Sequence, residues 1–188
     1  MGEGSTQTIT GWIVEVKDID VPWKDAPAPN WIRAFQQLSY SGVQTSVVRA
    51  ASTKLDRAMT GTLTPKSRGP GWVRFTNRYL FQNIRGMPPN DAIQEGACGA
   101  ATIGGLWISP EGLARLEPGQ TIETNERVGT TVKVGMVGAG SVTLSESGPL
   151  HRMDWTYDAR TGMLSATTLI QQIGLAQITH TLRLTGQQ

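Results

Sequence analysis

Short runs in which apolar and polar residues alternate dominate the chain, and Gly, Pro, Asn or Asp separates each run from the next. This period of two is typical of half-buried antiparallel strands. With no repeat at a fixed spacing and no linker, we expect a single β-rich domain over residues 1–188, with residues 1–8 flexible. The pattern predicts about ten strands, over residues 9–16, 42–49, 58–64, 72–82, 120–124, 130–137, 141–145, 150–157, 163–170 and 175–184.

The run over residues 72–82 is long and strongly alternating. Its apolar face carries Val73, Phe75, Tyr79 and Phe81. At about 3.3 Å per residue, a strand of this length spans about 36 Å. Such strands favour a mainly β fold in which a curved antiparallel sheet forms an open or half β-barrel.

Two short helices are predicted between the strands. Asn30 is placed to cap a helix over residues 31–38, whose apolar side chains fall on one face. Ser109 is placed to cap a second helix that starts at Pro110 and presents Leu113 to the core. Each helix has about two turns and is too short to be stable alone, so both must pack on the sheet.

Composition excludes several classes of protein. The single cysteine, Cys98, excludes an intrachain disulfide framework and a zinc site of several thiolates, and its small neighbours indicate a buried, inert thiol rather than a reactive one. No apolar run is long enough for a transmembrane segment. The net charge of +2 provides no global attraction to nucleic acid or anionic lipid. We expect no cofactor.

Basic residues gather between Arg57 and Asn90, a stretch without acidic residues. Arg74 and Arg78 alternate with the aromatic residues of their strand, such as Tyr79, and so lie on the opposite face. Binding of single-stranded nucleic acid needs cations and stacking rings on the same face. We therefore expect no nucleic-acid partner; a solvated face or a site for an anionic headgroup fits better.

The two histidines are the first candidates for chemistry. His180 lies in the last predicted strand, on the face that carries Ile178 and Leu182. A histidine on an apolar face is most often a core residue, and the alternative is a general base, with Tyr157 as its partner. His151 begins a different strand, and two histidines on separate strands do not indicate a metal site.

The first six residues are small, polar and acidic and lack the features of a signal peptide. We expect a periplasmic or extracellular protein from which a leader has been removed, with a cytoplasmic location as the alternative.

A late hairpin motif consists of Tyr157, Asp158, Thr161, Gly162 and Leu164. Together with a strand-to-helix junction over residues 105–110 and a long meander of strands, it resembles the bacterial lipoprotein-carrier-like family. The resemblance implies an open β half-barrel that holds a hydrophobic ligand against its concave side, under a lid of helices. It implies no catalytic residues.

The main functional hypothesis is a non-catalytic carrier in the cell envelope that binds a lipid, an acyl chain or another hydrophobic or amphiphilic molecule. An envelope protein is a possible further partner. Trp23, in a proline-rich loop, is expected to face a ligand or partner. The alternatives are an enzyme on the same scaffold and a structural or assembly subunit whose strands pair at exposed edges. The residues predicted to line the ligand site are Trp31, Phe35, Phe75, Tyr79, Phe81, Trp107, Trp155 and His180.

Overall fold

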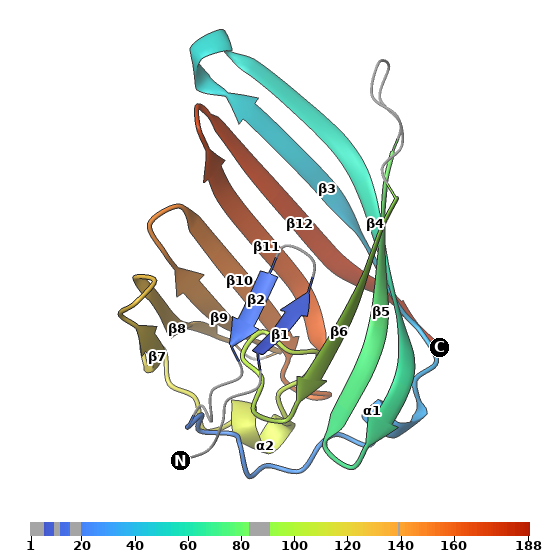
Figure 1. The fold of residues 1–188 in the computed structure, drawn as a ribbon. Coiled ribbons are helices and arrows are strands. Elements are labelled where there is room, and N and C mark those ends of the chain that lie inside the picture. The colour runs from blue at the N-terminus through green and yellow to red at the C-terminus, as the bar shows by residue number, and fades with distance from the viewer. Residues whose placement is uncertain (1–5, 10–11, 16–19, 83–90, 139) are drawn as a thin grey trace.

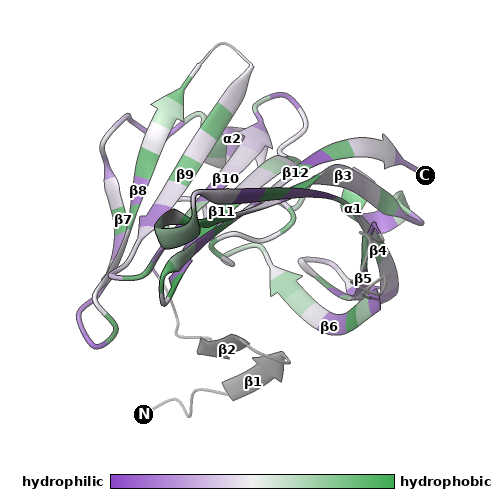
Figure 2. Cartoon of the chain, turned by 90° about the horizontal axis from the view of Figure 1, so that it is seen from above, coloured by the Kyte–Doolittle hydropathy of each residue, from purple (hydrophilic) through white to green (hydrophobic). Residues whose placement is uncertain are grey.

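The computed structural model describes residues 6–9, 12–15, 20–82, 91–138 and 140–188. Ten antiparallel strands form one curved sheet that does not close (Figure 1). Seen from above, the sheet curves from β7 round to β6 and these two edge strands do not meet (Figure 2). A separate two-stranded hairpin is not part of this sheet. The mainly β fold with an open, curved sheet and two short helices, predicted from the alternation, is confirmed.

Two meanders make up the sheet, and they join where the first strand after the proline-rich loop pairs with the last strand of the chain. The strand order is β6-β5-β4-β3-β12-β11-β10-β9-β8-β7. The bounds are β3 (Leu38–Val48), β4 (Thr53–Gly69), β5 (Trp72–Phe81), β6 (Asp91–Gly99), β7 (Thr121–Asn125), β8 (Thr130–Val137), β9 (Ser141–Ser147), β10 (His151–Asp158), β11 (Leu164–Ile173) and β12 (Ala176–Gln187). The hairpin consists of β1 (Thr6–Ile9) and β2 (Trp12–Glu15), and the helical segments are α1 (Trp31–Ala34), the 3-10 helix η1 (Arg49–Ala51) and α2 (Pro110–Leu113).

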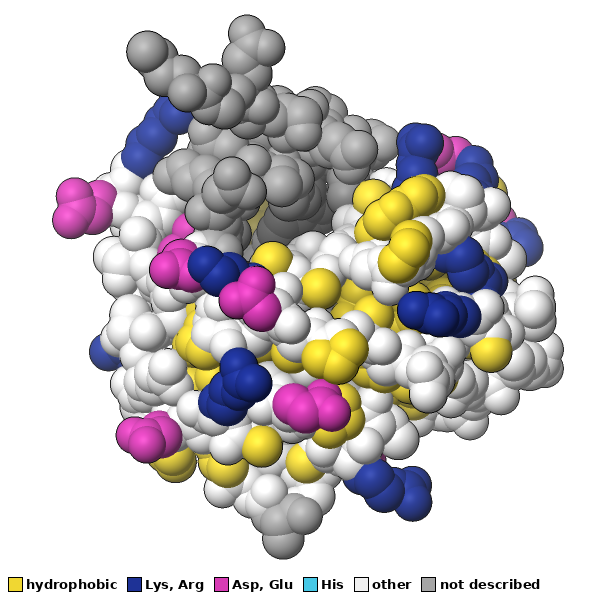
Figure 3. Space-filling model, turned by 90° about the horizontal axis from the view of Figure 1, so that it is seen from below, with side chains coloured by type: hydrophobic (Ala, Val, Ile, Leu, Met, Phe, Trp, Pro, Cys, Tyr) yellow, Lys and Arg dark blue, Asp and Glu magenta, His cyan; other side chains and the backbone are white. Residues whose placement is uncertain are grey.

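The core fills the lower end of the concave side, where α1, α2 and the segment between β6 and β7 lie (Figure 1). One cluster centres on Leu38, Leu63 and Val73, and a second on Val134 and Leu144. Seen from below, hydrophobic side chains are visible between the polar groups of this end, and charges of both signs surround them (Figure 3). Large apolar residues are therefore concentrated at the end of the sheet where α1 and α2 lie, and we call this part the closed end.

The predicted cap of α2 is confirmed. The Ser109 hydroxyl accepts a hydrogen bond from the Gly112 amide at 3.1 Å, and Pro110 occupies the first turn. Leu113 is buried, as predicted, but α2 is shorter than the expected two turns because it ends at Leu113. Leu116, which is also buried, lies beyond the end of the helix. The proline has no amide N–H that would need a partner, and the serine accepts from one of the free amides of this short helix, while the apolar side chains secure it to the sheet.

The first helix is shorter than predicted. It ends at Ala34, and Phe35 is already extended, with φ −63° and ψ 140°. Asn30 makes no side-chain capping bond. Leu38 belongs to β3, where it faces Leu63 of β4, because a place in the sheet outweighs the weak helical preference of a short segment.

Two further expectations are corrected. The run over residues 9–16 forms parts of two strands, in which Ile9 pairs with Trp12. Trp23, expected to face a ligand, is 1% exposed and packs in the second cluster, against the backbone of Gly112. Burial removes the large apolar area of the indole from water, and this gain in free energy exceeds the cost of leaving Nε1 of Trp23 without a hydrogen-bond partner.

Within the described ranges, no helix is long and apolar enough to cross a membrane.

Candidate ligand site on the concave face

Above the closed end, apolar side chains from five of six consecutive strands lie half-buried on the concave face. Ser46 of β3 is paired directly with Leu55 of β4 and with Ile178 of β12. Leu169 of β11 is paired directly with Met153 of β10. Directly paired residues of antiparallel strands point to the same face of a sheet, so these side chains share one surface. We call the set the upper concave surface; it consists of Leu55 (β4), Phe81 (β5), Met153 (β10), Leu169 (β11) and Ile178 (β12).

Exposure on this face changes along the strands. At the closed end Met59, Leu63 and Val73 are 3%, 3% and 0% exposed. Leu55, four residues before Met59 on the same face of β4, is only half-buried. The helices α1 and α2 lie at the lower part of the face (Figure 1), whereas the apolar side chains of the upper part are only half-buried. An apolar surface of this kind is what a ligand with hydrocarbon groups requires.

A row of polar side chains crosses the upper concave surface. Arg57, Gln44 and His180 are paired in line on β4, β3 and β12. The amide nitrogen of Gln44 lies 2.9 Å from Nε2 of His180. The ring of Phe81 meets the edge of the His180 ring, with centroids 6.3 Å apart, and the Arg57 guanidinium lies over Phe81 at 5.1 Å. This polar row has an apolar ring at its centre and can hold the polar end of an amphiphile.

Burial lowers the pKa of His180 below its ordinary value. The Gln44 amide donates to Nε2, which requires that this nitrogen be unprotonated. Both observations favour a neutral imidazole at neutral pH. His180 then offers hydrogen bonding rather than charge to a ligand.

A second polar pair lies at the far side of the same face. His151 of β10 and Glu146 of β9 approach to 2.6 Å between Nε2 and Oε1. Both side chains are about one quarter exposed. Glu146 faces Met153 across the ladder, so this pair borders the upper concave surface.

The residues predicted for the ligand site divide into four groups. Phe35 and Trp107 are 2% and 1% exposed and belong to the core, which leaves them no surface for a ligand. Trp31 packs edge-on against Phe35 at the closed end and donates from its indole nitrogen to the Thr161 carbonyl. Phe75, Tyr79 and Trp155 are half-buried beside the two clusters.

Of the predicted set, Phe81 and His180 meet on the upper concave surface. The predicted site lacked the four aliphatic residues that complete this surface, which are Leu55, Met153, Leu169 and Ile178. Their alternation was visible in the sequence, but the pairing of β3 with β12, which brings them to one face, was not.

The two residues proposed for acid/base chemistry are not brought together. Tyr157 is fully buried and donates to the Gly105 carbonyl at 3.1 Å, and burial raises its pKa. Met153, which shares a row with His180, lies four residues from Tyr157 along β10, about 13 Å at 3.3 Å per residue. Tyr157 therefore has a structural role, in which it holds the segment between β6 and β7 through Gly105.

Among the described residues, no three His, Cys, Asp or Glu side chains gather where they could hold a metal ion. Cys98 is buried, and this burial raises the pKa of its thiol to about 12. The thiol is therefore protonated at neutral pH and unreactive, as its small neighbours predict.

The basic residues of β5 lie on the convex side. Arg78 forms a two-pronged ion pair with Asp91, with distances of 2.6 to 3.2 Å. Phe75 and Tyr79 of the same strand pack against the core instead. Arg74 and Arg78 thus lie on the face opposite to Phe75 and Tyr79, as the alternation predicts, whereas the exposed Trp72 shares their convex face.

No protein-family model matches the chain, and no curated protein matches it.

Proposed function

We propose that the protein binds a hydrophobic or amphiphilic ligand, such as a lipid or an acyl chain, on the upper concave surface and does not alter it chemically. The single observation that carries this proposal is the half-buried apolar patch of Leu55, Phe81, Met153, Leu169 and Ile178 above a fully packed core. Residues of this kind are normally buried when the fold can bury them. The binding of hydrocarbon chains would remove them from water.

The polar row suggests an amphiphile rather than a plain hydrocarbon. The guanidinium of Arg57 and the His180–Gln44 pair lie among the apolar side chains. A chain with a polar end could lie on the apolar groups and direct that end to the row. The curved, open sheet also agrees with the resemblance to lipoprotein carriers, and a role in the cell envelope belongs to the same proposal.

Titration with a dansyl-labelled undecanoic acid tests the proposal. Trp155, on the same face, can transfer energy to a dansyl group bound nearby. About ten methylene groups at about 0.8 kcal/mol each predict a Kd on the order of 1 µM. We expect saturable emission that unlabelled undecanoic acid displaces and hexanoic acid does not. An absence of saturable binding up to about 100 µM would overturn the proposal.

A further inference from the structure

Four described turns lie at the same end of the strands, opposite α1 and α2 (Figure 1). In an antiparallel meander every second turn falls at the same end. These turns join β3 to β4, β7 to β8, β9 to β10 and β11 to β12, at residues 49–52, 126–129, 148–150 and 174–175. We call them the turn rim.

The turn rim exposes large apolar side chains. Leu175 and Leu150 are 73% and 66% exposed, and Ile173 and Val128 are 57% and 55% exposed. They come from three adjoining turns rather than from scattered sites. Isolated exposed apolar residues are ordinary, but several at the tips of neighbouring turns indicate a surface that meets another apolar phase.

In two ion pairs, the cation lies closer to the turn rim than the acid does. Lys54 pairs with Asp56 at 2.9 Å, and Arg152 pairs with Asp154 at 3.1 Å. In each pair the basic residue is two positions nearer the turn, about 7 Å at the rise of a strand. In these two pairs an approaching surface therefore meets the cation before the acid. The turn between β7 and β8 carries one exposed charge of each sign, Glu126 and Arg127.

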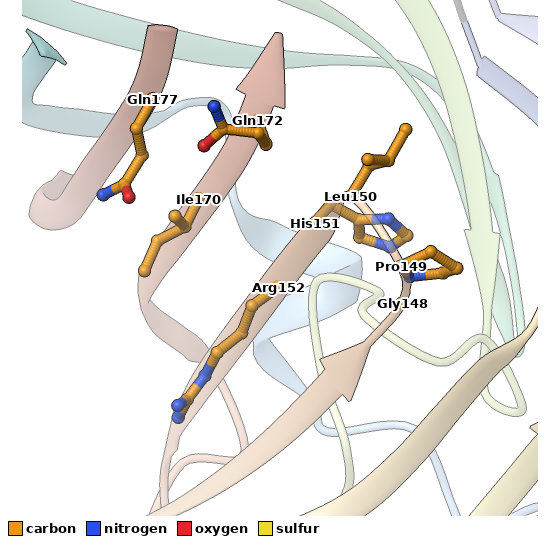
Figure 4. Close-up of a pocket in the computed structure, with 8 residues that line it drawn as sticks. All are labelled: Gly148, Pro149, Leu150, His151, Arg152, Ile170, Gln172 and Gln177. Atoms are coloured by element: carbon orange, nitrogen blue, oxygen red, sulfur yellow. The ribbon is translucent and has the colours of Figure 1, made fainter. Parts of the chain in front are cut away.

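A hollow of about 240 Å³ opens beside the Leu150 turn. Figure 4 shows the side chains around it: Leu150 and Arg152 from one hairpin, and Gln172 and Gln177 from the next. Ile170 forms part of its wall. Amide and guanidinium groups beside an apolar tip suit a polar, negatively charged headgroup whose hydrocarbon part lies against leucine.

We propose that the turn rim docks on a lipid surface that contains anionic lipids. Leu150, Ile173 and Leu175 enter the boundary between headgroups and acyl chains, while Lys54 and Arg152 lie at the level of the phosphates. This is the arrangement of apolar and basic groups that holds proteins at membrane interfaces. The inference stands independently of the proposed ligand on the upper concave surface.

Sedimentation with lipid vesicles tests the docking. The intact protein is mixed with vesicles of phosphatidylcholine and phosphatidylglycerol, and with vesicles of phosphatidylcholine alone. We expect stronger binding to the anionic vesicles, weakened by added salt, because exposed charges are screened. The double variant Leu150→Glu/Leu175→Glu is expected to bind about tenfold less tightly.

The matched control is Val43→Glu/Met136→Glu, which adds the same charge at two exposed apolar residues outside the rim. Val43 lies on the convex face of β3, and Met136 near the other end of β8. This control is expected to keep vesicle binding within about twofold of the parent.

Equal losses in the rim variant and the control would overturn the proposal, as would an absence of sedimentation of the parent protein with either vesicle. Light scattering separates one further outcome. If the parent is an oligomer that the rim variant dissociates, and neither binds vesicles, the rim is a contact between copies and the proposal is wrong. The dansyl titration reports on the concave face and is read separately.

Discussion

Replacement of Gly162 with alanine is expected to lower the free energy of unfolding by about 3 kcal/mol. Gly162 has φ of +72°, in the left-handed region that disfavours other L-residues. A Cβ atom at this position would also collide with the backbone carbonyl oxygen of Ile108. Strain of about 1–2 kcal/mol adds to the cost of displacing a packed backbone. Urea denaturation measured by circular dichroism gives the difference.

Gly119→Ala is the matched control. Gly119 has a similar φ of +82°, but nothing lies within 4 Å of the position that a Cβ would occupy. Its loss should therefore be about 1 kcal/mol, the cost of the backbone conformation alone. If the two variants lose the same free energy, close packing at Gly162 contributes nothing and the interpretation of this turn is wrong.

The Gly162 turn also anchors the segment that fills the closed end. The Ile108 amide donates to the Gly162 carbonyl at 3.0 Å, and the Leu164 amide donates to the Leu106 carbonyl at 2.9 Å. Trp107 forms a bridge with Met163 between these bonds. The turn at Gly162, which the hairpin motif of the sequence predicts, thus also holds the segment between β6 and β7 against the sheet.

Replacement of Ile178 with aspartate is expected to weaken binding of the dansyl fatty acid about thirtyfold. Ile178 lies at the centre of the upper concave surface, in line with Ser46 and Leu55. The variant removes apolar contact and places a carboxylate where a hydrocarbon chain would lie, together worth about 2 kcal/mol. The titration described above measures the change in Kd.

The neighbouring variant Thr179→Asp adds the same charge to the same strand but on the convex face, where Thr179 faces Thr45 and Ile170. Both variants carry the cost of aspartate in a strand, up to about 1 kcal/mol, so their stabilities should be similar. Binding to Thr179→Asp should stay within about twofold of the parent. Equal weakening by both variants would show that charge or stability, and not the concave face, controls binding.

Local patterns were sufficient to predict most elements. Alternation located nine of the ten strands of the sheet, although β4 extends about five residues beyond the predicted run at each end, and the spacing of Ser109 and Pro110 located the start of α2. These features depend on neighbours in the sequence. The exception is β6, which is rich in glycine and alanine and therefore shows little apolar alternation. Its Gly96 leaves room for the ring of Phe75.

The candidate site depended on contacts that local patterns do not contain. His180 meets Gln44 because β12 pairs with β3, and 136 positions separate the two residues. Without that register, the upper concave surface could not be assembled from its separate strands. The length of α1 was overestimated for a similar reason, since the competing place of Leu38 in the sheet was not visible in the sequence.

The largest aromatic residues were weighted too heavily as ligand contacts. Trp23, Trp107 and Phe35 are among the most buried side chains of the protein. An indole or phenyl ring removes more apolar area from water than any other side chain, so the core takes such rings first. Aliphatic side chains such as Leu169 and Ile178 make up most of the half-buried surface that is left.

Photolabelling with a fatty acid that carries a diazirine on its chain tests directly whether hydrocarbon chains bind on the upper concave surface. After irradiation and digestion, mass spectrometry locates the labelled residues. We expect saturable labelling, competed by excess undecanoic acid, at residues of the upper concave surface such as Met153, Leu169 and Ile178. Labelling confined to convex residues such as Thr168 and Thr179, or labelling that excess fatty acid does not reduce, would contradict it.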